Sequence, residues 1–164
     1  YGICTTKANA TKYNVTKVSD LASQASKFTI ATPPDGQSDP NVLPGVKPTY
    51  GFTFGSTKVL DAAVTYQAVI SGQAQFNICY TTSALITKDN FVLLQDDKNL
   101  FPIYQVAPII RQDTLSKSPA IATTLNKLAP YLTSTVSSQL QLQVVNGATP
   151  HDVAAQFLQS KGLI

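Results

Sequence analysis

The sequence predicts an α/β fold with a mixed, mostly parallel sheet. Segments rich in β-branched and aromatic residues alternate with segments of helical periodicity through the first two thirds of the chain. After residue 115 the pattern becomes wholly helical. The apolar stripes of these helices are too strong for a solvated surface, so we expect them to pack against another part of the protein. With 164 residues, of which 43% are hydrophobic, the chain is long enough for one domain or two small lobes.

The N-terminal segments begin this alternation. Residues 1–6 (YGICTT) and 28–32 (FTIAT) have the composition of short strands. Between them, residues 18–27 carry apolar side chains at helical spacing, which predicts a helix capped by Ser19. Residues 33–48 hold five of the ten prolines and therefore predict a long loop.

The middle of the chain contains the clearest helical pattern. Residues 50–55 (YGFTFG) predict an extended segment. Residues 56–73 follow the 3.6-residue period, which predicts a helix capped by Ser56 or Thr57 and stopped at Gly72.

Three more strands and three helices complete the expected order. The strands are expected at residues 76–80, 91–95 and 106–111. The helices are expected within residues 118–132, 134–147 and 149–162. Ser118 and Thr149 open the first and third, each followed by a proline, and Gly147 ends the second.

The composition excludes several classes of function. The net charge is only +3 and the lysines are scattered, so a nucleic-acid-binding surface is not expected. No apolar run approaches the length of a membrane span. Two cysteines and one histidine are too few for a zinc site, and neither a metal nor a cofactor is expected. Cys4 and Cys79 are either a disulfide of an exported protein or two small buried thiols.

Signatures of enzymes are also missing. The sequence contains no GxSxG, P-loop, GxGxxG or HExxH motif. His151 stands at a predicted helix start, where exposure is the default, so a thiol-dependent enzyme ranks far behind a binding protein. Asp96 and Asp97 are adjacent and point to opposite sides of an extended segment, which predicts a turn beside Lys98 and no acid–base pair.

Three of the seven tyrosines stand at ends of predicted strands. Tyr1 opens the first strand, Tyr80 closes the strand at 76–80, and Tyr104 precedes the strand at 106–111. An α/β sheet places its ligand crevice at strand ends. The tyrosines either form an aromatic box for a quaternary ammonium group or only bury apolar area at the ends of elements.

Several motifs resemble those of one transport family. They are VLLQDDKNLFPIYQVAPIIR at residues 92–111, YTT at 80–82 and LPGVKPTYGFTF at 43–54. Together they resemble the osmoprotectant-binding proteins of ABC importers, which are extracytoplasmic receptors for glycine betaine, choline and carnitine. The similarity runs over essentially the whole chain.

The resemblance implies a type II periplasmic-binding-protein-like fold of two lobes. Residues 1–104 then correspond to the second lobe. Residues 105–164 correspond to the returning crossing strand and the C-terminal helices of the first lobe, whose N-terminal part lies outside this chain. The resemblance also places the two cysteines on neighbouring crossing strands.

The resemblance further implies a set of ligand-binding residues. Tyr1, Tyr80 and Tyr104 fall at cage positions of the family, and Thr81 follows Tyr80 in the YTT motif. Asp39 stands where the family carries an arginine that clamps the solute carboxylate. Because an aspartate cannot form such a clamp, we expect a choline-like alcohol or a ligand with a second positive centre rather than a betaine.

The expected function is that of an extracytoplasmic solute-binding component, in the periplasm or lipid-anchored at the cell surface. It would present a quaternary ammonium solute to a membrane permease, without catalysis. The alternative is a sensor or interaction module that keeps the fold and has lost or changed the solute site. We also expect self-association of the chain, by exchange of the helical tail between copies.

Overall fold

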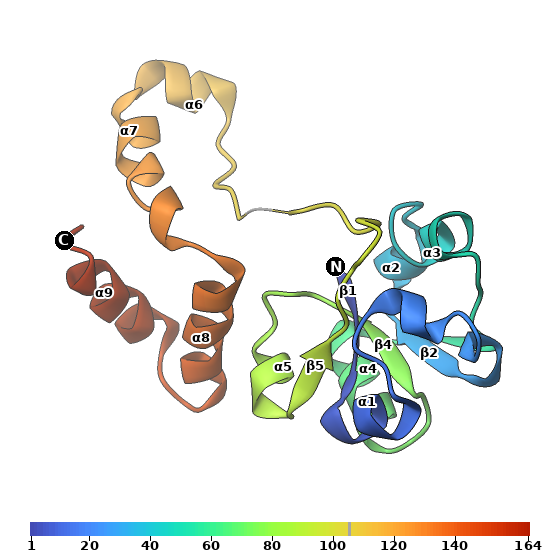
Figure 1. The fold of residues 1–164 in the computed structure, drawn as a ribbon. Helices are drawn as coiled ribbons and strands as arrows, with labels where there is room; N and C mark the ends of the chain where they lie inside the picture. The colour runs from blue at the N-terminus through green and yellow to red at the C-terminus, as the bar shows by residue number, and fades with distance from the viewer. Residues whose placement is uncertain (105) are drawn as a thin grey trace. The chain divides into compact units, whose positions relative to one another are not determined.

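The computed structural model describes residues 1–104 and 106–164, which divide into two compact units (Figure 1). The N-terminal unit is Tyr1–Ile103 and the C-terminal unit is Tyr104–Ile164. The assignment of these units to two lobes of a binding protein stays a prediction.

A five-stranded sheet forms the centre of the N-terminal unit. Its spatial order is β3-β2-β4-β1-β5. The strands are β1 (Gly2–Thr6), β2 (Thr29–Thr32), β3 (Ser56–Val59), β4 (Phe76–Cys79) and β5 (Phe91–Leu93). β2 pairs in parallel with β3 and β4, whereas β1 pairs antiparallel with β4 and β5. The predicted α/β fold with a mixed sheet is confirmed, with parallel and antiparallel pairings in equal number.

Short helices connect these strands. They are α1 (Lys7–Tyr13), α2 (Pro34–Ser38), α3 (Leu43–Tyr50), α4 (Ala62–Ile70) and α5 (Ala84–Lys88), with 3-10 turns η1 (Val18–Leu21) and η2 (Ala25–Lys27). Helices α1 and α5 have no counterpart among the predicted elements.

Two 3-10 turns replace the helix predicted at residues 18–27, so that prediction is wrong. Ser19, the expected cap, lies inside the first turn and donates from both its backbone N–H and its hydroxyl to the Asp97 carboxylate. A contact between residues distant in sequence therefore overrides the local helical pattern.

Two helices, α2 and α3, occupy the region predicted to be a long loop. Proline lies in the first turn of each, at Pro34 and Pro44. The N–H groups of the first turn have no acceptor within the helix, so the missing N–H of proline costs no hydrogen bond there. The extended segment predicted at residues 50–55 is also wrong at its start, because Tyr50 ends α3 and Gly51 adopts the left-handed conformation after it (φ 79°).

The helix predicted at residues 56–73 is shorter than expected. Ser56–Val59 forms β3, whose backbone pairs with β2, and α4 begins only at Ala62. All four residues of β3 are exposed, so the pattern of their side chains could not predict that their backbone pairs with β2. Gly72 ends this region as predicted, at a positive φ of 76°.

Successive residues along the inner strands belong to different apolar clusters, so the sheet is covered on both faces. The pairs that divide in this way are Ile3 and Cys4, Ile30 and Ala31, and Ile78 and Cys79. Side chains from η1 and α3 contribute to the first cluster, whereas side chains from α4 contribute to the second.

A disulfide joins the first and fourth strands. Cys4 on β1 and Cys79 on β4 are bonded, with their Cα atoms 5.9 Å apart. Both residues are fully buried, at 0% and 1% exposure. Of the two alternatives that the sequence leaves open, the structure has the disulfide.

The C-terminal unit is helical throughout its regular structure. Its elements are α6 (Gln112–Lys117), α7 (Ala120–Asn126), η3 (Ala129–Tyr131), α8 (Ser134–Val145) and α9 (Pro150–Ser160). The predicted cap of the last helix is confirmed, since the Thr149 hydroxyl accepts from the backbone N–H of Asp152. Helix α6 has no counterpart among the predicted elements.

The strand predicted at residues 106–111 is wrong. These residues have no regular structure, and the side chains of Val106 and Ile109 are 54% and 99% exposed. Pro108 cannot donate to a ladder, and the described residues of this unit contain no strand that could pair with the segment. The self-association of the chain stays a prediction. Within the described ranges, every helix is too short or too polar to traverse a bilayer.

Candidate functional site

Tyr1 and Tyr80 lie side by side at one edge of the sheet. In the antiparallel pair of β1 and β4, Gly2 is opposite Cys79, so the residue before β1 and the residue after β4 are neighbours. Their ring centroids are 5.1 Å apart, with the ring planes inclined by 39°. Both tyrosines are partly buried. Two of the three predicted cage tyrosines therefore form a pair.

A single carboxylate joins the two tyrosines. The Tyr80 hydroxyl donates to Oδ2 of Asp35 at 2.7 Å, and the Tyr1 hydroxyl donates to the same oxygen. Asp35 lies in the first turn of α2, which follows β2. Because β2 and β4 are parallel, their carboxyl ends share one edge of the sheet, and this brings Asp35 to Tyr80.

The hydrogen bonds among Tyr1, Tyr80 and Asp35 favour a charged carboxylate and protonated phenols. The hydrogen bond from the Tyr1 hydroxyl is the main cause that lowers the pKa of Asp35 below its ordinary value. Burial, followed by the hydrogen bond to Asp35, raises the pKa of Tyr80 to about 12. The same two causes raise the pKa of the Tyr1 phenol. At neutral pH the Asp35 carboxylate is therefore charged and the two phenols are neutral.

No basic side chain neutralises this carboxylate. In the part of the chain that the structure describes, the one ion pair is between His151 and Asp152, so no lysine or arginine nitrogen lies within 4 Å of the Asp35 oxygens. Asp35 is exposed to solvent, and its pKa is perturbed by hydrogen bonds and burial rather than by a cation. The rings therefore have beside them a carboxylate that no lysine or arginine side chain neutralises.

Asp35 is the site residue that the sequence analysis missed. The signal for it is the PPDG run directly after β2, because a polar residue just past a parallel strand faces the ligand edge of the sheet. That run was interpreted as part of a proline-rich loop, whereas it opens helix α2.

Asp39, the predicted replacement for the clamp, lies at the other end of α2. Its Oδ1 accepts from the backbone N–H of Asn41 at 2.8 Å, a local turn contact. Burial lowers the pKa of the Tyr1 amino group, and the charge of Asp39 partly opposes this, so Asp39 is near Tyr1. The carboxylate bonded to the tyrosine hydroxyls is nevertheless that of Asp35.

Thr81 and Tyr104 are the remaining predicted site residues. Thr81 is partly buried in the turn that begins at Tyr80, where the backbone N–H of Ser83 donates to the Tyr80 carbonyl at 2.9 Å. Tyr104 is the first residue of the C-terminal unit, and 55% of its surface is exposed. Its place in the cage stays a prediction.

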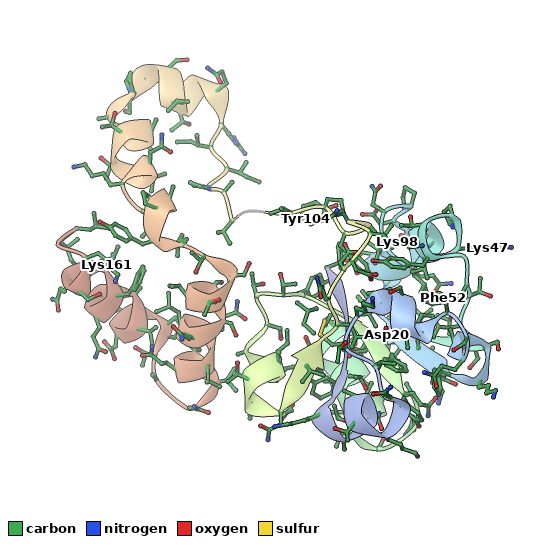
Figure 2. All side chains as sticks on the ribbon, in the orientation of Figure 1. Asp20, Lys47, Phe52, Lys98, Tyr104 and Lys161 are labelled. Atoms are coloured by element: carbon green, nitrogen blue, oxygen red, sulfur yellow. A yellow bond between two sulfur atoms is a disulfide. The ribbon has the colours of Figure 1, made fainter. Side chains whose placement is uncertain are left out.

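The turn predicted at Asp96 is confirmed and anchors the end of the N-terminal unit. The Asp96 carboxylate accepts from the backbone N–H groups of Leu100 and Phe101 and from the hydroxyl of Tyr50. The Lys98 ammonium lies 5.3 Å from the centre of the Tyr50 ring. Figure 2 labels Lys98. These contacts fix the chain's path shortly before residue 104.

Comparison with solved structures gives the class of the fold. A crystal structure described as a glycine betaine/carnitine/choline ABC transporter matches 99% of this chain with a TM-score of 0.81, at 27% sequence identity. The chain covers 60% of that structure. It therefore has the periplasmic-binding-protein-like α/β fold expected from the resemblance.

The family follows from the sequence comparison. The chain belongs to the OpuAC family, the substrate-binding domain of the ABC-type glycine betaine transport system, whose pattern matches residues 1–160.

Individual relatives are binding proteins of transport systems. The chain is 30% identical over 164 residues to the ergothioneine transport permease/ergothioneine binding protein EgtU of Helicobacter pylori, covering 99% of the chain and 30% of that relative. It is 27% identical over 176 residues to a glycine-betaine-binding protein of Pseudomonas aeruginosa, covering 100% of the chain and 57% of that relative. These names agree with the prediction that the chain is not an enzyme.

Proposed function

We propose that the chain contributes one wall of a quaternary ammonium site in the extracytoplasmic binding component of an ABC importer. The observation that carries the proposal is the Tyr1–Tyr80 pair, with ring centroids 5.1 Å apart and both hydroxyls bonded to Asp35. In this proposal the hydroxyls stay bonded to the carboxylate, and the solute packs on the aromatic rings. A quaternary ammonium group has no N–H to donate, and ring faces are the surface that attracts it.

Other features support the same class of ligand. Each ring face contributes roughly 0.5–2 kcal/mol to binding of a cation. The Asp35 charge adds a long-range attraction for a positive head group. In this proposal Tyr104 supplies a third ring, and Thr81 and Asp39 line the site. The relatives named for glycine betaine and ergothioneine support a solute of this kind.

The proposed location is extracytoplasmic, and the proposed partner is a membrane permease. The buried disulfide between Cys4 and Cys79 supports an oxidising compartment, because such bonds are rare in reducing cytosol. The closed, solute-bound form would be the one that the permease recognises. A lipid anchor at the cell surface remains part of the proposal.

Calorimetry on the full chain tests the function. Choline and glycine betaine are titrated into the wild-type protein and into Tyr80→Ala and Tyr80→Phe. Removal of the ring in Tyr80→Ala is expected to weaken binding at least about tenfold, or roughly 1.4 kcal/mol. Tyr80→Phe retains the ring face, so its affinity is expected to stay within about threefold of wild type.

A matched control uses a tyrosine at the opposite edge of the sheet. Tyr13 packs on Phe28, the residue before β2, with ring centroids 4.6 Å apart. Tyr13→Phe should leave the affinity unchanged. Absence of heat with every quaternary ammonium solute tested would contradict the proposal and favour the sensor or interaction module.

A further inference from the structure

The charge at the tyrosine pair distinguishes solutes that share one head group. Choline and glycine betaine both carry a trimethylammonium group, but choline ends in a neutral alcohol and glycine betaine in a carboxylate. The uncompensated Asp35 carboxylate, bonded to both phenols, attracts the head group of either solute. It repels only the second group of the betaine.

The N-terminal unit has no arginine that could clamp a solute carboxylate. The chain has a single arginine, Arg111, and it belongs to the C-terminal unit. A bidentate clamp needs a guanidinium group, which a lysine does not provide. Lys98, the lysine that precedes Tyr104 in the sequence, donates to the carbonyl of Thr49 and lies against the Tyr50 ring. The charge that hydrogen bonds hold beside the two rings is therefore that of the Asp35 carboxylate.

We infer that Asp35 makes the site selective for monocationic quaternary ammonium solutes over zwitterionic ones. This inference rests on the proposed function of the site. Asp35 has two separable effects, because it orients the phenol rings through hydrogen bonds and supplies a negative charge. Asparagine in its place retains a carbonyl oxygen that accepts from both hydroxyls and removes only the charge.

The test is the ratio of choline affinity to glycine betaine affinity in the full chain. Asp35→Asn is expected to lower this ratio at least about threefold. The Asp35 charge attracts the whole of choline, whereas for glycine betaine the repulsion of the solute carboxylate offsets part of the attraction of the head group. Raising the salt concentration from 0.01 M to 0.15 M should weaken choline binding to the wild type more than betaine binding. In Asp35→Asn this difference in salt dependence should shrink.

Asp89→Asn is the matched control, since it removes a carboxylate from the residue before Asn90, whose carbonyl accepts from the N–H of Lys7 at the end of β1 away from Tyr1. It is expected to leave the ratio within about twofold of wild type. An unchanged ratio in Asp35→Asn, or a larger change in Asp89→Asn, overturns the inference while the site itself stands. Failure of both solutes to bind the wild type overturns the proposed function instead.

Discussion

Replacing Cys4 and Cys79 together with alanine removes the covalent bond between β1 and β4. The bridge joins residues 75 positions apart, so it restricts a large loop of the unfolded chain. In the chain-entropy description a loop of this size lowers the entropy of the unfolded state by about 15 cal/mol/K, or about 4.5 kcal/mol at 25 °C. Native disulfides in small domains typically contribute about 2–5 kcal/mol, so the free energy of unfolding should fall within that range.

Equilibrium unfolding in urea, followed by circular dichroism, measures this loss. The double variant should unfold at a lower urea concentration than the wild type. The matched control is a reducing agent, which should lower the wild-type midpoint toward that of the variant and leave the variant unchanged. A double variant within about 0.5 kcal/mol of the oxidised wild type would refute the reasoning, because no loop restriction of this size is then present.

Two further predictions concern the site and the packing. Asp35 stays charged and Tyr80 stays protonated between about pH 5 and pH 9, so neither group should change the solute affinity in that range. The stability that Asp35 contributes, since its pKa is lowered, should be present above its ordinary value of 3.8 and be lost as the pH falls through the folded value. The stability that Tyr80 contributes should be present below pH 10 and be lost as the pH rises through about 12. Unfolding midpoints across the pH range check both, and a midpoint that stays constant below pH 3.8 and above pH 10 would contradict this assignment. Gly55→Ala should destabilise by at least about 2 kcal/mol, because a Cβ there would lie 2.1 Å from the backbone oxygen of Ser26. Gly2→Ala, whose Cβ would meet the end of a flexible side chain, should cost less than about 1 kcal/mol, and equal urea midpoints for the two variants would contradict the argument.

The strands of the inner sheet could be predicted from the sequence because their composition is decided by burial. Residues of β1, β2 and β4 are nearly all buried, and their β-branched and aromatic content reflects this. β3 is exposed along its whole length, so its sequence carries no comparable signal. Its pairing depends on the backbone of β2.

The prolines illustrate a second limit of the sequence analysis. Proline usually kinks or breaks a helix when it stands inside one, although α3 continues past Pro48, and it favours a helix when it stands in the first turn. Pro34 and Pro44 are of the second kind, and the positions alone do not distinguish the two cases. The long loop was therefore predicted where α2 and α3 lie.

Part of the candidate site could be predicted and part could not. The resemblance predicted Tyr1 and Tyr80 as cage residues, and the antiparallel register of β1 and β4 explains why their rings lie side by side. Asp35 is separated from Tyr80 by 45 residues, and only the parallel pairing of β2 with β4 brings them together. A contact of that kind depends on the order of the strands in the sheet, which the spacing of apolar residues along the sequence does not predict.

The order of the strands has a consequence for how the disulfide forms. Within this chain, β1 is made before β4 and β5, the two strands that flank it in the sheet. Its two edges are therefore not both paired until about ninety further residues have been made, several seconds at roughly 5–20 residues per second. Until β4 pairs with β1, the thiol of Cys4 has no native partner, so in an oxidising compartment a bond to another molecule competes with the correct one. A factor that shields β1 while the chain folds in that compartment should increase the yield of correctly bonded protein.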